Sequence, residues 1–168
     1  KGSIKAQHKL YKLYANAMYR TCYNMMYNKE DAEDMLQESF SEAFMTLERF
    51  RFESTFGAWL KRIVINKCLN EIKRRKPDIK FAEDMGQYEG IYEEEKVDVL
   101  NLNVDRVKQA MKELPEGRRM IFQLYMLEGY DHREIAEILN VSESNSKTQY
   151  MRARTRMKEI LNNRIYEN

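Results

Sequence analysis

Charged side chains at helical spacing are the groups in this sequence best suited to a chemical role, and that role is binding. Residues 59–76 carry seven basic residues and one acidic residue. Asn66 and Asn70 are interspersed among them. Lysine and arginine neutralise phosphates, and asparagine forms hydrogen bonds with base edges. This segment therefore predicts a helix that binds nucleic acid.

A neighbouring segment has the opposite charge. Residues 28–48 carry seven acidic residues and one basic residue. DNA repels an acidic helix, so we expect the partner of this segment to be a basic protein surface. The charge pattern fits equally well two helices that only neutralise each other, and composition does not separate the two interpretations.

A second basic helix is predicted near the C-terminus, within the spacing of a helix-turn-helix. Ala136 suits a close helix crossing, Asn140 a left-handed turn and Ser142 an N-cap. Residues 143–158 then carry five basic residues and one acidic residue. A basic, amphipathic second helix is required for reading the major groove, so this segment predicts DNA binding. The alternative interpretation is a charged, solvent-exposed helix of a bundle. Ser146 takes a usually apolar position, so we expect looser packing there.

Helices must position these side chains, because the chain has only 6 Gly and 2 Pro and long stretches of helical apolar spacing. The N-terminal half predicts helices over 31–47, with Asp31 as N-cap, and over 56–75, with Ser54 or Thr55 as N-cap. Its predicted core residues are apolar and recur at helical spacing: Ala32, Met35, Leu36, Phe40, Ala43, Phe44, Leu47, Leu60, Ile63, Val64, Cys68, Leu69 and Ile72.

The C-terminal half predicts further helices, each bounded by a recognisable signal. Apolar spacing resumes at residue 104, is interrupted at Pro115, and then runs to Glu128, with Gly129 in the C′ position. Two helices follow, one over 131–139 and one from Ser142 or Glu143 to Asn162. The inward face of the last helix is predicted from its apolar residues: Tyr150, Ala153, Met157, Ile160 and Leu161.

The predicted fold class is all-α, with two small helical domains and a linker between them. The domains are an N-terminal helical bundle at 4–76 and a C-terminal helix-turn-helix domain at 104–168. Pro77 ends the preceding helix, and residues 76–103 carry eight acidic residues, three basic residues and a poor apolar pattern. We therefore expect residues 77–103 to form a flexible acidic linker.

Other residue types give no sign of catalysis. Cys22 and Cys68 lack metal-ligand spacing and are expected in the core, which fits a reducing compartment. His8 and His132 have no partners that suggest metal binding or catalysis, and both are expected at the surface. Because the sequence contains no nucleophile–base pair, metal cluster or phosphate loop, we expect neither a cofactor nor an enzyme. No apolar run approaches ~18 residues, so no direct membrane insertion is expected.

Several motifs together resemble the extracytoplasmic-function (ECF) sigma factors, which are sigma-70-like subunits of bacterial RNA polymerase. Residues 31–40, 50–51 and 56–66 resemble region 2 of this family. Leu114-Pro115, residues 127–136 and residues 147–154 resemble region 4, so the resemblance spans nearly the whole chain in the right order. It implies a dissociable subunit that binds core polymerase and recognises the −10 and −35 promoter elements.

The resemblance also implies roles for individual residues. The docking residues for the clamp helices of the largest polymerase subunit are Asp34, Gln37 and Glu38. The connector over 50–56 matches the loop that holds a base flipped from the −10 element. The predicted −10 contacts are Phe52, Lys61, Arg62, Asn66, Lys67 and Asn70. The predicted −35 contacts are Lys147, Thr148, Arg152 and Arg154.

Three aromatic residues near this connector have two possible roles each. Phe52 and Phe56 either touch DNA or pack the loop. Trp59 is expected in the core, and stacking on an unpaired base is its alternative role.

The implied partners are core polymerase (clamp helices and flap), promoter DNA and an anti-sigma factor, often membrane-bound. The anti-sigma factor would hold a cytoplasmic protein at the inner membrane, covering its acidic helix and inter-module cleft. Two other classes of protein remain open. One is a helix-turn-helix regulator that binds duplex DNA without polymerase, and the other is a module that binds only proteins.

Overall fold

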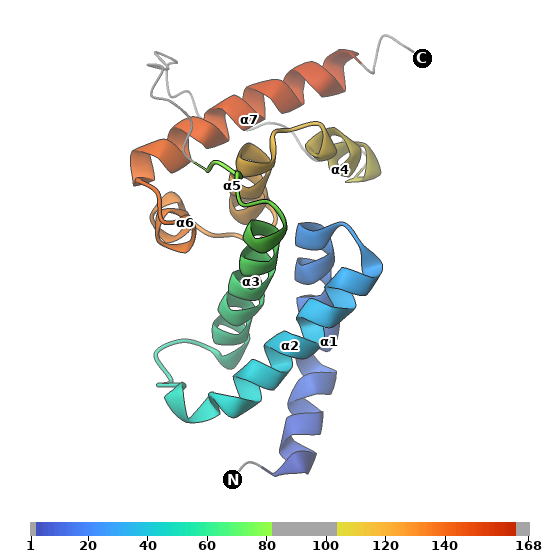
Figure 1. The fold of residues 1–168 in the computed structure, drawn as a ribbon, viewed down its shortest axis with the longest axis vertical. Helices are drawn as coiled ribbons and strands as arrows, with labels where there is room; N and C mark the ends of the chain where they lie inside the picture. Colours follow the sequence, from blue (N-terminus) through green and yellow to red (C-terminus); the bar gives the residue numbers. More distant parts are fainter. Residues whose placement is uncertain (1–2, 82–103, 164–168) are drawn as a thin grey trace. The chain divides into compact units, whose positions relative to one another are not determined.

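The computed structural model describes residues 3–81 and 104–163, and every regular element in these ranges is a helix (Figure 1). The elements are α1 (Ile4–Met26), α2 (Lys29–Met45), the short 3-10 helix η1 (Leu47–Arg49), α3 (Phe56–Arg75), α4 (Val104–Lys112), α5 (Glu116–Met126), α6 (His132–Leu139) and α7 (Glu143–Asn163). They form two compact units, Lys1–Asp78 and Ile79–Asn168. The all-α class with two helical groups is confirmed. Residues 82–103, most of the predicted linker, lie outside the described residues, as do residues 164–168.

The N-terminal unit is a bundle in which α1, α2 and α3 pack against one another in pairs. Its core follows the predicted apolar spacing, with Leu60, Val64 and Cys68 of α3 fully buried. Cys22 of α1 is fully buried as well, which confirms the prediction for both cysteines. Among the predicted core residues, three are only half-buried: Phe44, Leu47 and Ile63. Ile65, which the predicted core did not include, is fully buried.

The start of α2 differs from the prediction by two residues. Tyr27 ends α1 in a left-handed conformation with φ 55°, and Asn28 is the N-cap of α2. The side-chain oxygen of Asn28 accepts a hydrogen bond from the backbone N–H of Asp31 at 2.9 Å. The prediction of Asp31 as N-cap was therefore wrong: it lies in the first helical turn, where a carboxylate faces the positive end of the helix dipole. Thr55 caps α3 through a bond from the N–H of Ala58 at 3.2 Å.

The C-terminal unit is organised around α7, which packs against α4, α5 and α6. Gly129 is left-handed with φ 77°. However, α5 ends at Met126 with Leu127 as its C-cap, two residues earlier than predicted, so the prediction of Gly129 in the C′ position was wrong. One continuous cluster of buried side chains joins α4, α5 and α7: Ala110, Met111, Leu114, Phe122, Ala153, Met157, Ile160 and Leu161.

The turn between α6 and α7 has the predicted helix-turn-helix geometry. Asn140 is left-handed with φ 57°, and the N–H of Val141 donates to the carbonyl of Ala136 at 3.1 Å. Oγ of Ser142 accepts from the N–H of Asn145 at 3.0 Å, which caps α7 as expected. The turn is thus closed by local hydrogen bonds, and α7 begins directly after it.

Candidate polymerase and DNA interfaces

The three predicted docking residues share one exposed face of α2. Asp34, Gln37 and Glu38 are all exposed, and their spacing of three and four residues places them side by side on the helix. The opposite face of α2, which includes Ala32 and Met35, is buried in the bundle. Asp34 makes no ion pair with any residue of the described ranges. This acidic face is therefore open to a protein partner.

Lys67 of α3 lies between two carboxylates of α2. Its ammonium is 2.9 Å from Glu42 and 3.7 Å from Glu38, and its side chain is 30% exposed. The hydrogen bond to Glu42 and the charge of both carboxylates raise the pKa of Lys67. Two residues predicted for different partners, Glu38 and Lys67, thus meet each other. At this position the helices do balance each other's charge, so the interpretation left open by composition holds in part.

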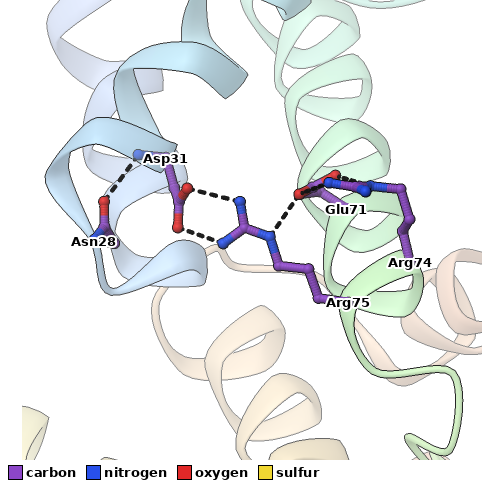
Figure 2. A network of polar contacts seen from close by, with 5 residues as sticks. All are labelled: Asn28, Asp31, Glu71, Arg74 and Arg75. Atoms are coloured by element: carbon purple, nitrogen blue, oxygen red, sulfur yellow. Dashed lines mark hydrogen bonds and ion pairs between the residues drawn. The ribbon is translucent and has the colours of Figure 1, made fainter.

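A second set of charges joins the start of α2 to the end of α3 (Figure 2). The guanidinium of Arg75 donates from Nη2 to Asp31 at 2.7 Å and from Nε to Glu71. Arg74 donates from Nε and Nη2 to both carboxylate oxygens of Glu71 at 2.7 Å. These bonds lower the pKa of Glu71 to about 2, with Arg74 as the larger cause, and the Arg75 bond lowers the pKa of Asp31. The network links two helices whose contact residues are 44 positions apart.

We expect this network to make the N-terminal unit sensitive to acid. Glu71 has an ordinary pKa of 4.5 and a folded value of about 2, so the folded state binds its proton more weakly than the unfolded state does. Its stabilising effect is complete above the unfolded pKa and is lost as the pH falls through the folded pKa. Urea unfolding followed by fluorescence of Trp59, the only tryptophan, should show a falling midpoint from about pH 5 to about pH 2.

The matched variant for this experiment is Glu71→Gln, which removes the titrating group and keeps the side-chain shape. Its urea midpoint should fall less steeply over the same pH range than that of the wild type. An equal fall in both proteins would show that the network does not contribute to the acid sensitivity.

The predicted −10 residues of α3 do not all share one face. Arg62, Asn66 and Asn70 follow one another at intervals of four and form one line along the helix, with both asparagines exposed. Lys61 lies one turn before Val64 and Ile65, on the packing side of α3, and is half-buried. Together with the pairing of Lys67 to α2, this leaves a narrower polar line than the prediction proposed.

An aromatic loop cluster, made of Phe50, Phe52, Phe56 and Trp59, lies at the start of α3. The ring centroid of Phe50 lies 4.7 Å from that of Phe52, 5.2 Å from that of Trp59 and 6.0 Å from that of Phe56. Phe52 is 84% exposed and has φ 59°, which is uncommon for a bulky residue. Phe56 and Trp59 are half-buried, so the prediction of Trp59 as a core residue is only partly correct. In the aromatic loop cluster the exposed ring of Phe52 therefore packs on a base of three half-buried rings.

On α7, the four predicted −35 residues share the same degree of burial. Lys147, Thr148 and Arg152 are half-buried, and the Lys147 ammonium is 2.6 Å from Glu143 one turn earlier. Arg154 is also half-buried and lies close enough to Tyr150 to influence its pKa. Lys147 thus has a neighbouring carboxylate that a DNA phosphate would have to replace.

His132 is not the surface residue that was predicted, although His8 is exposed as expected. The His132 ring is half-buried and stacks on Tyr125, with centroids 4.6 Å apart and planes 15° apart. Its Nδ1 shares a hydrogen bond of 2.9 Å with Oγ of Ser146, which is fully buried. Burial, and then the nearby Lys147 ammonium, lower the pKa of His132. The sequence did not reveal this environment because all three contacts come from other helices.

The described residues contain no group of His, Cys, Asp and Glu side chains that would hold a metal ion. None of the helices in the described ranges is long and apolar enough to cross a membrane.

Comparison with known proteins gives the same two regions as the fold. Residues 10–77 match the family described as Sigma-70 region 2, and residues 105–157 match Sigma-70, region 4. The ECF RNA polymerase sigma factor SigW of Bacillus subtilis is 29% identical over 172 residues, covering 96% of this chain and 91% of the relative. The ECF RNA polymerase sigma-E factor of Haemophilus influenzae is 33% identical over 149 residues, covering 82% and 76%.

Two solved structures share the fold. The sigma factor RpoE in complex with the anti-sigma factor NepR from Bartonella quintana has a TM-score of 0.65 and 21% identity, covering 95% of this chain and 98% of the other. CnrH in complex with the cytosolic domain of CnrY has a TM-score of 0.60 and 23% identity, covering 96% and 90%. Fold, family matches and relatives agree, and the chain therefore belongs to the ECF sigma factors, the non-enzymatic RNA polymerase subunits that contain sigma-70 regions 2 and 4.

Proposed function

We propose that this ECF sigma factor binds core polymerase and recognises the −10 and −35 promoter elements through three separate surfaces. The domains are region 2 at 4–76, a linker at 77–103 and region 4 at 104–168. The observation that carries the proposal is that α2 presents an exposed acidic face, whereas α3 and α7 present polar or basic lines. Surfaces of such different charge suit different partners, because a basic protein surface and DNA are not recognised by the same side chains.

The docking surface consists of Asp34, Gln37 and Glu38 and binds the clamp helices of the largest polymerase subunit. Asp34 is exposed and makes no ion pair with a described residue, so binding to a basic partner breaks no existing contact there. Glu38 is shared with Lys67 at 3.7 Å, a weak surface pair that a stronger partner readily replaces.

The −10 surface combines the exposed ring of Phe52 with the polar line of Arg62, Asn66 and Asn70. An exposed aromatic ring stacks on an unpaired base, and this preference holds for every base because each has a π face. A non-glycine residue with positive φ costs roughly 1–2 kcal/mol, which favours a functional reason for the conformation of Phe52. Lys61, which was also predicted for this surface, adds its positive charge beside this line, whereas the charge of Lys67 is balanced by Glu38 and Glu42.

The −35 surface is α7, in which Lys147, Thr148, Arg152 and Arg154 contact the major groove. Region 4 also contacts the polymerase flap. We further propose that an anti-sigma factor covers these surfaces in a cytoplasmic, inactive state. This proposal is supported by the two structures of similar fold. One is a complex of the sigma factor RpoE with the anti-sigma factor NepR, and the other is a complex of CnrH with the cytosolic domain of CnrY.

The test of this function is run-off transcription by core polymerase with and without the protein, in the absence of any anti-sigma factor. We expect discrete promoter-dependent transcripts from genomic templates only when the protein is present, together with its retention on immobilised core enzyme. Absence of both transcripts and retention would overturn the docking and promoter assignments together.

Replacement of Lys147 or Arg152 by Ala is expected to weaken recognition of the −35 element by ~1–3 kcal/mol if the side chain contacts a base. A base contact lowers affinity mainly for the preferred sequence. A phosphate contact lowers affinity uniformly across sequences and reduces the salt slope by about 1. Binding of holoenzyme to preferred and altered −35 sequences at several salt concentrations separates the two results, and an unchanged affinity in both variants contradicts the α7 assignment.

A further inference from the structure

Ser146 of α7 is a polar residue in a position that has no exposure to solvent. Its relative exposure is 0%, and the same helix places the buried residues Gln149 and Ala153 one and two turns later. A buried hydroxyl without a partner is destabilising, so Ser146 requires one. Its partner is Nδ1 of His132, at 2.9 Å. This hydrogen bond therefore joins α7 to α6.

His132 touches α7 at two points that are one helical turn apart. It hydrogen-bonds with Ser146, and its ring lies 5.5 Å from that of Tyr150, four residues later. Tyr125 of α5 packs against both rings: its ring centroid is 4.6 Å from that of His132 and 4.5 Å from that of Tyr150. Two contacts at successive turns restrain rotation of a helix about its own axis, whereas apolar packing alone is not directional.

The position of His132 is itself held by the start of α6. Asp131 and Glu134 form a capping box: Asp131 accepts from the N–H of Glu134 at 2.8 Å, and Glu134 accepts from the N–H of Asp131 at 2.9 Å. His132 is the first residue of α6, directly after this cap. The capping box therefore fixes the backbone from which the imidazole reaches α7.

We propose that the His132–Ser146 hydrogen bond is a positioning contact that sets the rotation of α7 and so directs Lys147 and Thr148 toward the −35 bases. The inference rests on the proposed role of α7 in −35 recognition. Lys147 and Thr148 follow Ser146 directly in the chain, so any rotation of α7 at Ser146 turns both side chains by the same angle. Base recognition depends on the direction of hydrogen bonds, and such bonds weaken steeply when they are misaligned.

The experiment uses the full chain with core polymerase and a template library randomised over the −35 element, with the −10 element held constant. Sequencing of the transcripts gives the base preference at each randomised position. The variants are Ser146→Ala, which removes the hydroxyl, and His132→Phe, which keeps a ring against Tyr125 and removes the hydrogen bond. His132→Gln is the conservative variant, because its amide retains a donor and an acceptor.

We expect Ser146→Ala and His132→Phe each to reduce the −35 base preference by about 3- to 10-fold, the range of a single lost hydrogen bond. The double variant Ser146→Ala, His132→Phe should lose no more −35 base preference than either single variant, since each single substitution already removes the same hydrogen bond. His132→Gln should recover part of the preference. Preferences at −10, tested in a second library, should not change.

The control for simple destabilisation is Ser39→Ala in α2. Ser39 is also fully buried, and its Oγ donates to the carbonyl of Met35 at 2.6 Å, so its loss affects packing without touching region 4. The positioning role is overturned if Ser39→Ala flattens the −35 preference as Ser146→Ala does. It is also overturned if the two single effects add in the double variant or if neither variant changes the preference. If polymerase with the wild-type protein transcribes the library without any −35 preference, the result overturns the proposed role of α7 rather than the positioning contact.

Discussion

Replacement of Asp34 by Arg is expected to abolish binding of core polymerase while leaving the fold intact. Asp34 is exposed in the middle of the acidic face of α2 and makes no ion pair with a described residue, so the change disturbs no packing. Placing a positive charge against a basic partner costs several kcal/mol, which is at least a hundredfold in affinity at about 3 kcal/mol. The measurement is retention of the variant on immobilised core enzyme, with thermal unfolding to establish that it is folded.

The matched control for that experiment is Glu48→Arg. Glu48 is an exposed acidic residue of η1, outside α2, and the substitution changes the net charge by the same amount. It should retain near wild-type affinity for core polymerase. Wild-type affinity in Asp34→Arg would contradict the docking assignment. Equal losses in both variants would mean that overall charge controls binding, with no specific role for this face.

Replacement of Leu60 by Ala is expected to destabilise the N-terminal unit by about 2–5 kcal/mol, the range for a leucine removed from a close-packed core. Leu60 has 0% exposure, at the start of α3 and next to Trp59 of the aromatic loop cluster. Urea unfolding followed by Trp59 fluorescence reports directly on this unit, because the chain has a single tryptophan.

A matched control is available on α1, where Leu13 is 69% exposed. Leu13→Ala makes the same chemical change and should alter the free energy of unfolding by no more than about 0.5 kcal/mol. If the two variants unfold at the same urea concentration, Leu60 does not form part of a close-packed core in the N-terminal unit.

The sequence predicted well those features that depend on neighbours along the chain. The helix-turn-helix turn was predicted from Asn140 and Ser142, and both adopt the expected roles. The buried faces of α2, α3 and α7 follow from apolar spacing, because residues three and four apart share one side of a helix whatever the rest of the chain does. The sequence motifs also predicted the family, and the comparisons with known proteins confirm it.

The errors occur where a residue's role depends on a distant partner. Asn28 and Asp31 are both good N-caps, and spacing alone did not choose between them. In the structure the Asp31 carboxylate binds Arg75 of α3, which leaves the capping role to Asn28. Lys67 was counted with the DNA contacts because of its charge, but its orientation toward Glu38 and Glu42 depends on how α2 and α3 pack.

The sequence by itself determined the all-α class, the helix-turn-helix and the membership of the ECF sigma factors, since each depends on local spacing and residue type. Only the tertiary structure decided which charged residues face solvent and which face each other. It also decided that Ser146, unusual in its motif, has His132 as its partner. Both outcomes require side chains from different helices to meet. Contacts between side chains of different helices are determined by how the helices pack, and the spacing of residues along the sequence does not specify that packing.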